Sequence, residues 1–174
     1  MLKIKKVEAE DISEVKKLLT ETWIDTYGSI LSKEAIEKVT SVWHEPTKLE
    51  RQANDENIIF NVAVDDYQQM VGLITIAKND GDIADLLRLY VLPDKQRQGI
   101  GKLLLDNALT QLGLYKKLRL EVEEKNEKGK AFYTKIGFRT IDTNIENVEG
   151  EELNTIIMEK ALQFNSCEKL NYKL

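Results

Sequence analysis

The feature that most constrains the fold is the stretch over residues 87–105, where an apolar strand leads through a turn and two glycines into a helix. The apolar residues of the strand are Leu86, Leu87, Leu89, Val91 and Leu92. Such a nearly continuous run is typical of a strand buried on both faces, and Pro93 ends it. From Ile100 onward apolar residues recur at helical spacing, so Gly99 and Gly101 lie at the helix start. Unpaired N–H groups and the positive dipole end at a helix start favour the binding of a bulky anion such as a pyrophosphate.

The loop before this helix carries a short motif. It reads Gln96-Arg97-Gln98-Gly99-Ile100-Gly101, and Arg97 and Lys102 add positive charge. Two other phosphate loops fit less well, because no further glycine completes G-x-G-x-x-G and Lys102 is followed by Leu103 where a P-loop has Ser or Thr. The hexamer resembles the coenzyme A signature Q/R-x-x-G-x-G/A of the GNAT superfamily of N-acetyltransferases. A corner whose glycines serve only tight packing is the alternative.

A second motif lies over residues 118–140, where a strand, a polar turn, a short helix and another strand follow one another. It contains Asn126, Ala131, Phe132, Tyr133, Gly137 and Phe138. These residues resemble the GNAT pattern N-x-x-A-x-x-x-Y-x-x-x-G-F, with the alanine displaced along the helix. Asn126 and Tyr133 are about two helical turns apart and share one face, and Gly137 is a typical helix stop. Because the two motifs occur in the order that the family shows, we interpret Asn126 and Tyr133 as functional residues. The alternative is that Asn126 only caps a helix and Tyr133 is only a core aromatic residue.

Apolar periodicity and turn residues predict the remaining elements. We expect strands over residues 2–7, 58–64, 70–77, 83–92, 118–122, 138–141 and 153–158. Gly28 and Ser32 separate the first two predicted helices, and a further helix begins near Pro46. The three strands between residues 58 and 92 are expected to form an antiparallel meander.

This order of elements resembles the GNAT fold across residues 2–160. The resemblance implies an α/β (α+β) protein with a mixed central sheet of six to seven strands, flanked by four to five helices and splayed between the fourth and fifth strands. We expect one domain over residues 1–162 and a loosely ordered tail over residues 163–174.

The same resemblance implies that acetyl-CoA is the cosubstrate and suggests which residues hold it. Main-chain groups of Leu89, Tyr90 and Val91 would pair with the pantetheine arm. The pyrophosphate would be held by Gln96, Arg97, Gln98, Gly99, Ile100, Gly101 and Lys102. Asn126 and Tyr133 would complete the coenzyme site.

Direct transfer of an acetyl group to an amine needs an acid for the leaving thiolate and a route for the amine proton. The family position of the acid is Tyr133, a phenol with an ordinary pKa of about 10. For the base we expect Asp85, because strand alternation would put it on the face of Leu89 and Val91. A solvated carboxylate is the alternative reading of Asp85, and Glu121 and Glu123 are substitutes on the next strand.

In this family the first helices and the loop between them largely determine the specificity for the acceptor. The segment WIDTYGSIL resembles the corresponding segment of small-molecule acetyltransferases, including polyamine acetyltransferases. Trp23 and Tyr27 are one helical turn apart and would form an aromatic wall, with Glu21 and Asp25 attracting a cation. The alternative is that Trp23 belongs to the core and Tyr27 packs beneath the loop. We expect His44 to be a surface or loop residue.

The composition disfavours several classes of binding partner. The net charge of −5 gives no general reason to bind nucleic acid, and a single cysteine and a single histidine provide no zinc ligand set. The N-terminus lacks the apolar stretch of a signal peptide, and no segment has the roughly 20 apolar residues needed to cross a bilayer. We therefore expect a cytoplasmic protein without metal, nucleic-acid or membrane partners. Relatives often dimerise, so a homodimer is also an expectation.

Three functional classes follow. The leading one is an acetyl-CoA-dependent N-acetyltransferase acting on a primary amine of a small molecule, such as a polyamine. The second is a protein or peptide N-acetyltransferase. The third is a non-catalytic acyl-CoA-binding regulatory module, which the presence of Asn126 and Tyr133 disfavours.

Overall fold

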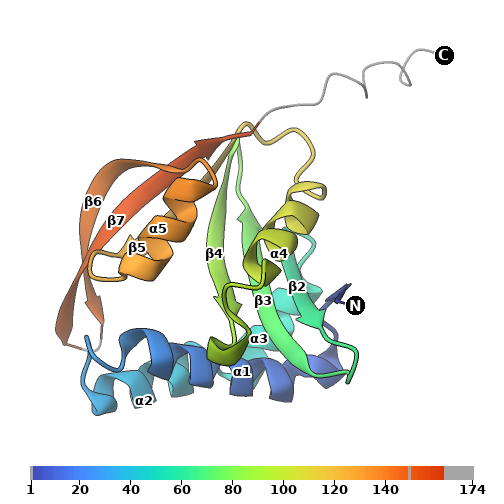
Figure 1. Cartoon of the computed structure of the whole chain (residues 1–174), viewed down its shortest axis with the longest axis horizontal. Helices are drawn as coiled ribbons and strands as arrows, with labels where there is room; N and C mark the ends of the chain where they lie inside the picture. The colour runs from blue at the N-terminus through green and yellow to red at the C-terminus, as the bar shows by residue number, and fades with distance from the viewer. Residues whose placement is uncertain (1, 149, 163–174) are drawn as a thin grey trace.

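All seven strands of the computed structural model lie in one mixed sheet (Figure 1). The structure describes residues 2–148 and 150–162, so the tail expected over residues 163–174 lies outside the described part. In chain order the strands are β1 (Lys3–Lys6), β2 (Ile58–Val64), β3 (Met70–Lys78), β4 (Ile83–Val91), β5 (Lys117–Glu123), β6 (Arg139–Val148) and β7 (Glu151–Ala161). Their order across the sheet is β1-β2-β3-β4-β5-β7-β6, and only β4 and β5 are parallel neighbours. The predicted meander of β2, β3 and β4 is confirmed.

Helices cover both faces of this sheet. They are α1 (Ile12–Tyr27), α2 (Lys33–Val42), α3 (Pro46–Asn54), α4 (Ile100–Leu109) and α5 (Glu127–Lys135), with short 3-10 turns η1 (Ala9–Asp11) and η2 (Pro93–Lys95). In Figure 1, α1 and α2 run across the lower end of the sheet, whereas α4 and α5 lie along its strands. The predicted mixed sheet with four to five helices is therefore confirmed.

The helix boundaries follow the local sequence signals. Gly28 follows the last residue of α1, and Pro46 occupies the first turn of α3, where its missing N–H costs nothing. Ser32 caps α2, because its Oγ accepts a hydrogen bond of 3.2 Å from the amide of Ala35. These starts and stops were all readable from the chain.

Two apolar cores lie on opposite faces of the sheet. On one face, Leu104 of α4 packs against Ile74 of β3. On the other face, Leu19 of α1 and Leu49 of α3 pack against Phe60 of β2. All five side chains are completely buried. Burial at about 1.5–3 kcal/mol per large apolar side chain makes β2 and β3 the rigid centre of the protein.

The parallel pair β4 and β5 is hydrogen-bonded over only part of its length. Pairing runs from Ile83 with Lys117 to Leu86 with Leu120, and it stops there. Beyond that point residues 88–91 pair only with β3, and residues 121–123 pair only with β7. We call this diverging part of the two strands the splay. It confirms the predicted separation between the fourth and fifth strands.

A β-bulge in β4 changes which side chains share a face. The register between β3 and β4 shifts at Leu87, which has no partner on β3. As a result Leu86, Leu89 and Val91 all contact the core beneath α4, and Asp85 lies on the opposite face. The expectation that Asp85 shares a face with Leu89 and Val91 is therefore wrong, because simple alternation does not survive the extra residue.

The C-terminal hairpin is longer than the sequence indicated. A strand of four residues is expected over residues 138–141, but β6 continues to Val148 and is exposed along most of its length. Its polar, solvent-facing sequence lacks the alternation of a half-buried strand. Val148 and Leu153 at the tip of the hairpin pack against Ile36 and Val39 of α2. This contact fixes the first helices across the end of the splay.

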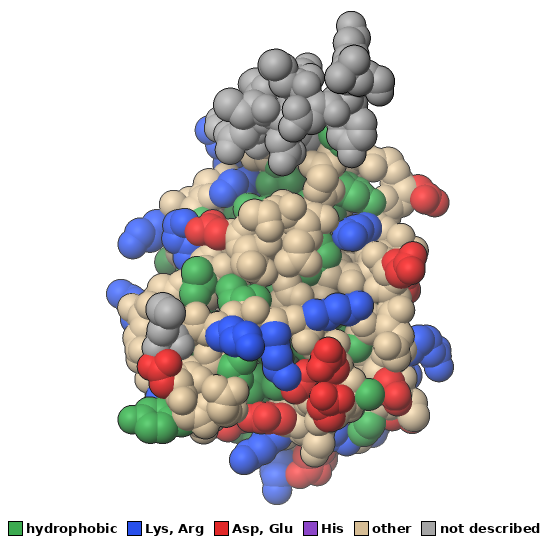
Figure 2. Space-filling view, turned by 90° about the vertical axis from the view of Figure 1, so that its right-hand side faces the viewer, with side chains coloured by type: hydrophobic (Ala, Val, Ile, Leu, Met, Phe, Trp, Pro, Cys, Tyr) green, Lys and Arg blue, Asp and Glu red, His purple; other side chains and the backbone are tan. Residues whose placement is uncertain are grey.

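The N-terminal edge of the sheet is protected by charge. The edge strand β1 carries Lys3, Lys5 and Lys6, and Figure 2 shows Lys and Arg side chains spread over this side, with acidic side chains gathered in its lower part. Charged edge strands resist pairing with another sheet. Among the described helices, none is long and apolar enough to span a membrane.

Candidate functional site

The glycine loop is built from two residues with left-handed backbone conformations. Arg97 has φ +64° and Gly99, the residue before α4, has φ +84°. Nothing lies within 4 Å of the place where a Cβ of Gly99 would be, so the glycine is needed for its backbone angle and not for space. The helix begins with the bond from the amide of Leu103 to the carbonyl of Gly99. The amides of residues 100–102 therefore have no partner within the helix and are available to an anion.

Side chains brace this loop from below. The Gln96 amide donates to the carbonyl of Val91 at 3.3 Å, and the Gln98 amide donates to the carbonyl of Asp94 at 3.2 Å. The Arg97 side chain is exposed. Lys102 forms an ion pair with Asp106 one turn along the helix. Arg97 is thus the cation of the loop that is best placed to turn towards a bound phosphate.

The main chain of β4 offers hydrogen-bonding groups to the splay. The amide of Leu92 bonds to the carbonyl of Val71 at 3.0 Å, so the backbone of Leu92 faces β3. Because these groups alternate along an antiparallel strand, Tyr90 also turns its main chain to β3, whereas Leu89 and Val91 turn theirs to the splay. Two of the three residues expected to pair with an extended ligand therefore have the right orientation.

Three tyrosines from different elements lie close enough to affect one another's pKa: Tyr27 of α1, Tyr90 of β4 and Tyr133 of α5. We call them the phenol cluster. Burial raises the pKa of Tyr133 well above 10, and nearby Tyr90 raises it further. Burial likewise raises the pKa of Tyr27, aided by Tyr90, Tyr133 and the carboxylate of Glu123. Burial also raises the pKa of Tyr90, against the opposing effect of Arg88. All three phenols therefore keep their protons at neutral pH.

Tyr133 is held by aromatic rings and by the ends of its helix. Its ring makes edge contacts with Phe132 at 5.3 Å and with Phe138 at 5.5 Å between ring centroids. The side chain of Asn126 caps α5 by accepting a 2.9 Å hydrogen bond from the amide of Gly129. Gly137 takes a left-handed conformation with φ +96°, as the helix-stop prediction requires.

Trp23 anchors the aromatic residues of the first helices. It is 6% exposed and packs on Tyr27 with 4.4 Å between ring centroids, and its edges meet Trp43 and His44. The alternative interpretation, that Trp23 belongs to the core, therefore agrees with the burial of Trp23. Tyr27 is partly exposed. The expectation of a surface or loop histidine is correct as to the loop, since His44 lies in the turn before α3, but wrong as to the surface, since His44 is only 1% exposed.

We predict that His44 of the folded protein stays neutral far below the pH at which a histidine is ordinarily protonated. Burial, with the nearby charges of Arg88 and Lys16, lowers the pKa of His44 from 6.5 to about 4. The unfolded chain takes up this proton more readily than the folded protein, because the pKa of His44 is lower in the folded state. The free energy of unfolding is therefore at its full value above pH 6.5 and falls by roughly 3 kcal/mol as the pH drops towards 4. Because His44 is the only histidine, its imidazole NMR signal can be assigned directly. A titration midpoint near 6.5 in the folded protein would contradict this.

Asp85 is engaged in an ion pair at the closed end of the splay. Its carboxylate accepts hydrogen bonds of 2.9 and 3.3 Å from Arg119 on β5, and one of 2.5 Å from the side-chain amide of Asn79. Arg119 is the residue opposite Asp85 in the parallel pair, so the ion pair joins β4 and β5 before they diverge. The structure gives Asp85 a bridging role between the strands. Its assignment as a base stays a prediction.

Near the phenol cluster lie three acidic residues, two on β5 and one on β6. Glu121 accepts a hydrogen bond of 3.3 Å from Thr155 on β7. Burial raises the pKa of Glu146 on β6, and its proximity to Glu121 raises it further. Glu123, two residues along β5, is only 3% exposed. This face of the splay is therefore suited to a cationic ligand.

The sequence motifs missed several of these features. Gly72 of β3 is one, because a Cβ there would lie 2.9 Å from the carbonyl of Tyr90 and 3.2 Å from Leu104. A lone glycine in an apolar strand was the only available signal. The Tyr90 side chain and the burial of Glu123 depend on tertiary contacts and had no local signal. Gly129 is needed because a Cβ would lie 2.9 Å from the capping side chain of Asn126.

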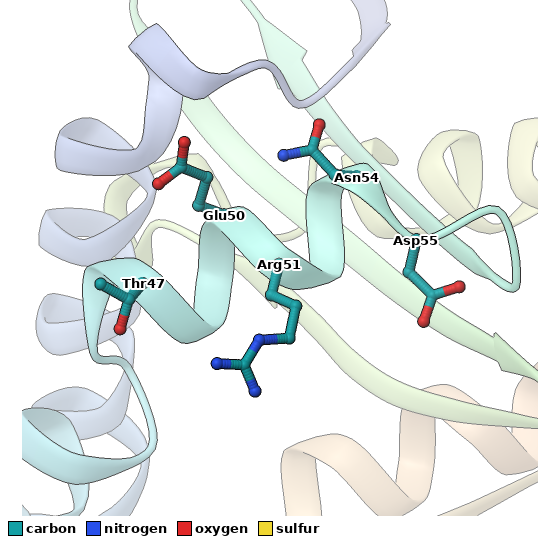
Figure 3. A pocket seen from close by; sticks show the side chains of 5 residues that line it. All are labelled: Thr47, Glu50, Arg51, Asn54 and Asp55. Carbon is teal, nitrogen blue, oxygen red and sulfur yellow. The ribbon is translucent and has the colours of Figure 1, made fainter.

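A separate hollow of about 510 Å³ lies along α3 (Figure 3). It is lined by Thr47, Glu50, Arg51, Asn54 and Asp55. None of these belongs to either motif or to the phenol cluster, so we assign the hollow no part in the site. In the described part of the chain, no group of three or more His, Cys, Asp or Glu side chains could hold a metal ion.

Known proteins resemble this chain in sequence and in fold. The family model described as an acetyltransferase (GNAT) domain matches residues 29–162. Spermidine N(1)-acetyltransferase of Thermoplasma acidophilum is 32% identical over 150 residues, which cover 82% of this chain and 91% of the relative. Peptidyl-lysine N-acetyltransferase YjaB of Salmonella typhimurium is 37% identical over 78 residues, which cover 45% and 48% of the two chains.

The solved structures agree with these matches. PaiA N-acetyltransferase from Thermoplasma acidophilum, solved in complex with coenzyme A, superposes with a TM-score of 0.83 at 30% identity and covers 93% of this chain and 99% of that one. Since the family model spans most of the chain and the spermidine relative aligns over 82% of it, the protein belongs to the GNAT family of acetyl-CoA-dependent N-acetyltransferases.

Proposed function

We propose that this acetyltransferase transfers the acetyl group to a primary amine of a small cationic molecule of the polyamine class. The observation that carries the proposal is the acidic face formed by Glu121, Glu123 and Glu146 next to the phenol cluster. Carboxylates attract an acceptor that carries several ammonium groups. The spermidine acetyltransferase of Thermoplasma acidophilum, aligned over most of the chain, supports the same class.

The coenzyme site in this proposal uses backbone groups more than side chains. The free amides of residues 100–102 and the Arg97 side chain hold the pyrophosphate, and the main chains of Leu89 and Val91 pair with the pantetheine arm. Asn126 keeps the start of α5 in place beside it. Tyr133 donates its hydroxyl proton to the leaving thiolate.

A panel of acceptors tests the proposal. Purified protein is incubated with acetyl-CoA and either spermidine, putrescine, single alkyl amines or lysine-containing peptides, and the release of free thiol is followed. We expect the highest kcat/KM with amines that carry at least two ammonium groups, and a weaker reaction with single alkyl amines of equal length. A ranking led by neutral or acidic acceptors would contradict the polyamine assignment.

Acetylation of peptidyl lysine is the second candidate. It is favoured by the likeness to YjaB, which covers less than half of either chain. A lysine side chain also presents an alkyl ammonium to the acidic face. A kcat/KM for peptides that exceeds that for free polyamines would favour this second function.

We predict that Gly99→Ala weakens coenzyme A binding by about tenfold, or roughly 1.4 kcal/mol. An alanine at φ +84° is strained, so the loop relaxes and turns its amides away from the anion. Gly113→Ala is the matched control, because Gly113 has φ +62° and equally open surroundings but lies outside the motif. Both variants should lose similar stability, and only the first should lose affinity in calorimetric titrations. Equal affinities for coenzyme A would contradict this.

A further inference from the structure

Glu123 is a buried carboxylate whose chemistry the fold leaves unused. It is the last residue of β5, at the wide end of the splay, and it is only 3% exposed. Its Oε2 is inaccessible to solvent and accepts no hydrogen bond from any described residue. A buried, unpaired carboxylate oxygen costs several kcal/mol, so such a group is rarely retained without a partner.

The side chain that the structure shows to interact with Glu123 is a neutral phenol. Tyr27 of α1 lies close enough for the Glu123 carboxylate to raise its pKa, and Tyr90 and Tyr133 adjoin Tyr27 in the phenol cluster. On its own strand the nearest titratable side chain on the same face is Glu121, which contacts Glu146 of β6. No lysine, arginine or histidine among the described residues forms an ion pair with Glu123. Glu123 therefore lacks a cationic partner among the described residues, and an ammonium group of the acceptor would supply one.

We propose that Glu123 receives the reacting ammonium of the acceptor and removes its proton. This inference rests on the proposed function, because it assumes that the acceptor is an amine. Glu123 lies at the diverging ends of β4 and β5, beside the cluster that contains the candidate acid Tyr133. One carboxylate can thus bind the cation and then serve as its base.

The step balances as follows. The ammonium gives one proton to the Glu123 carboxylate, and the freed nitrogen lone pair forms a bond to the carbonyl carbon of the thioester. The carbon–sulfur bond breaks, and the thiolate takes the hydroxyl proton of Tyr133. The second proton lost by the nitrogen as the amide forms returns to the Tyr133 oxygen. Glu123 then releases its proton to water, so one proton is produced per acetyl group transferred.

The other carboxylates are less suited to this role. Asp85 is bonded to Arg119 and Asn79 at the closed end of the splay. Glu121 is exposed and already accepts a hydrogen bond from Thr155. A base is most effective where its carboxylate is free to accept the substrate proton at close range. Among the acidic residues compared, Glu123 has a buried oxygen that no described residue hydrogen-bonds, and it lies near Tyr27 of the phenol cluster.

Glu123→Gln tests the inference, because it keeps the shape and removes the base. With an alkyl amine of pKa about 10, kcat/KM at pH 7 should fall by about a hundredfold. The loss should shrink steadily as the pH rises towards 10, since the amine then loses its proton in solution. With trifluoroethylamine, which is largely neutral at pH 7, the loss should be less than about fivefold.

Two further variants serve as controls. Glu124→Gln removes the same charge from the neighbouring exposed position and should leave the rates unchanged. Glu123→Asp retains a carboxylate and should keep the wild-type shape of the pH profile at a lower rate. Titration with coenzyme A shows whether each variant is folded and still binds the cosubstrate.

The outcomes separate the inference from the proposed function. A wild-type protein that acetylates none of the amines would overturn the proposed function and, with it, this inference. An active wild type in which Glu123→Gln is as fast as wild type would overturn the inference alone. A loss that is the same at every pH and for every amine would also overturn it, since it would indicate a purely structural carboxylate. If Asp85→Asn abolishes the reaction while Glu123→Gln stays active, Asp85 is the base and the inference is overturned.

Discussion

Tyr133→Phe is expected to lower kcat by about a hundredfold or more while leaving the affinity for coenzyme A nearly unchanged. General acid catalysis by a positioned side chain contributes about 10²–10⁴ in rate, and the phenol is the proton donor that the second motif and the cluster place beside the splay. Burial raises the pKa of Tyr133, so the proton is present on the hydroxyl at neutral pH. The ring itself stays packed between Phe132 and Phe138 in the variant, so binding should survive.

Steady-state rates and calorimetric titration of coenzyme A measure the two parts of this prediction. Tyr67→Phe is the matched control, because it removes a hydroxyl from a side chain that is 90% exposed and outside the site. The control should keep the wild-type kcat. If Tyr133→Phe also keeps it, the thiolate must obtain its proton elsewhere and Tyr133 is not the acid.

Phe138→Ala is expected to lower the free energy of unfolding by about 3–5 kcal/mol, the usual cost of removing a large core ring. Phe138 is 1% exposed in the core beneath α4, and its amide bonds to the carbonyl of Tyr133 at 3.0 Å. The cavity would also remove the ring edge that supports the Tyr133 side chain. We therefore expect kcat to fall together with stability, measured by urea denaturation at equilibrium.

Phe132→Ala separates burial from the contact with Tyr133. Its ring meets Tyr133 at 5.3 Å, much as Phe138 does, but Phe132 is only partly buried on α5. It should therefore cost clearly less stability than Phe138→Ala. Equal losses in the two variants would show that the aromatic contact with Tyr133 dominates over burial in the core.

The fold was largely readable from the chain because its signals are local. Prolines, glycines and serines set the ends of α1, α2 and α3, and continuous apolar runs marked β2, β3 and β4 as central strands. Where the pattern weakens, the prediction was incomplete. Most of β6 is exposed, so its sequence carries no alternation and only the first few residues were assigned.

The site was only partly readable. Two short motifs located the loop before α4 and the tyrosine of α5, because backbone angles at Gly99 and Gly137 restrict the residue type. The Leu87 bulge, the buried His44 and the bond between Asp85 and Arg119 each depend on which strand or helix packs alongside. No periodicity in one segment reports on such a partner.

The amino-acid sequence by itself determined the glycine loop, the order of strands and helices, and the tyrosine that makes acid chemistry plausible, since each is specified by neighbouring residues. Only the tertiary structure decided that Tyr27, Tyr90 and Tyr133 lie close together, and that Glu123 is buried near Tyr27 with an oxygen that no described residue hydrogen-bonds. Those residues come from α1, β4, α5 and β5, and their proximity is produced by two parallel strands that stop pairing after Leu86. Burial and charge at that point are collective properties of the packed sheet, which no single segment encodes.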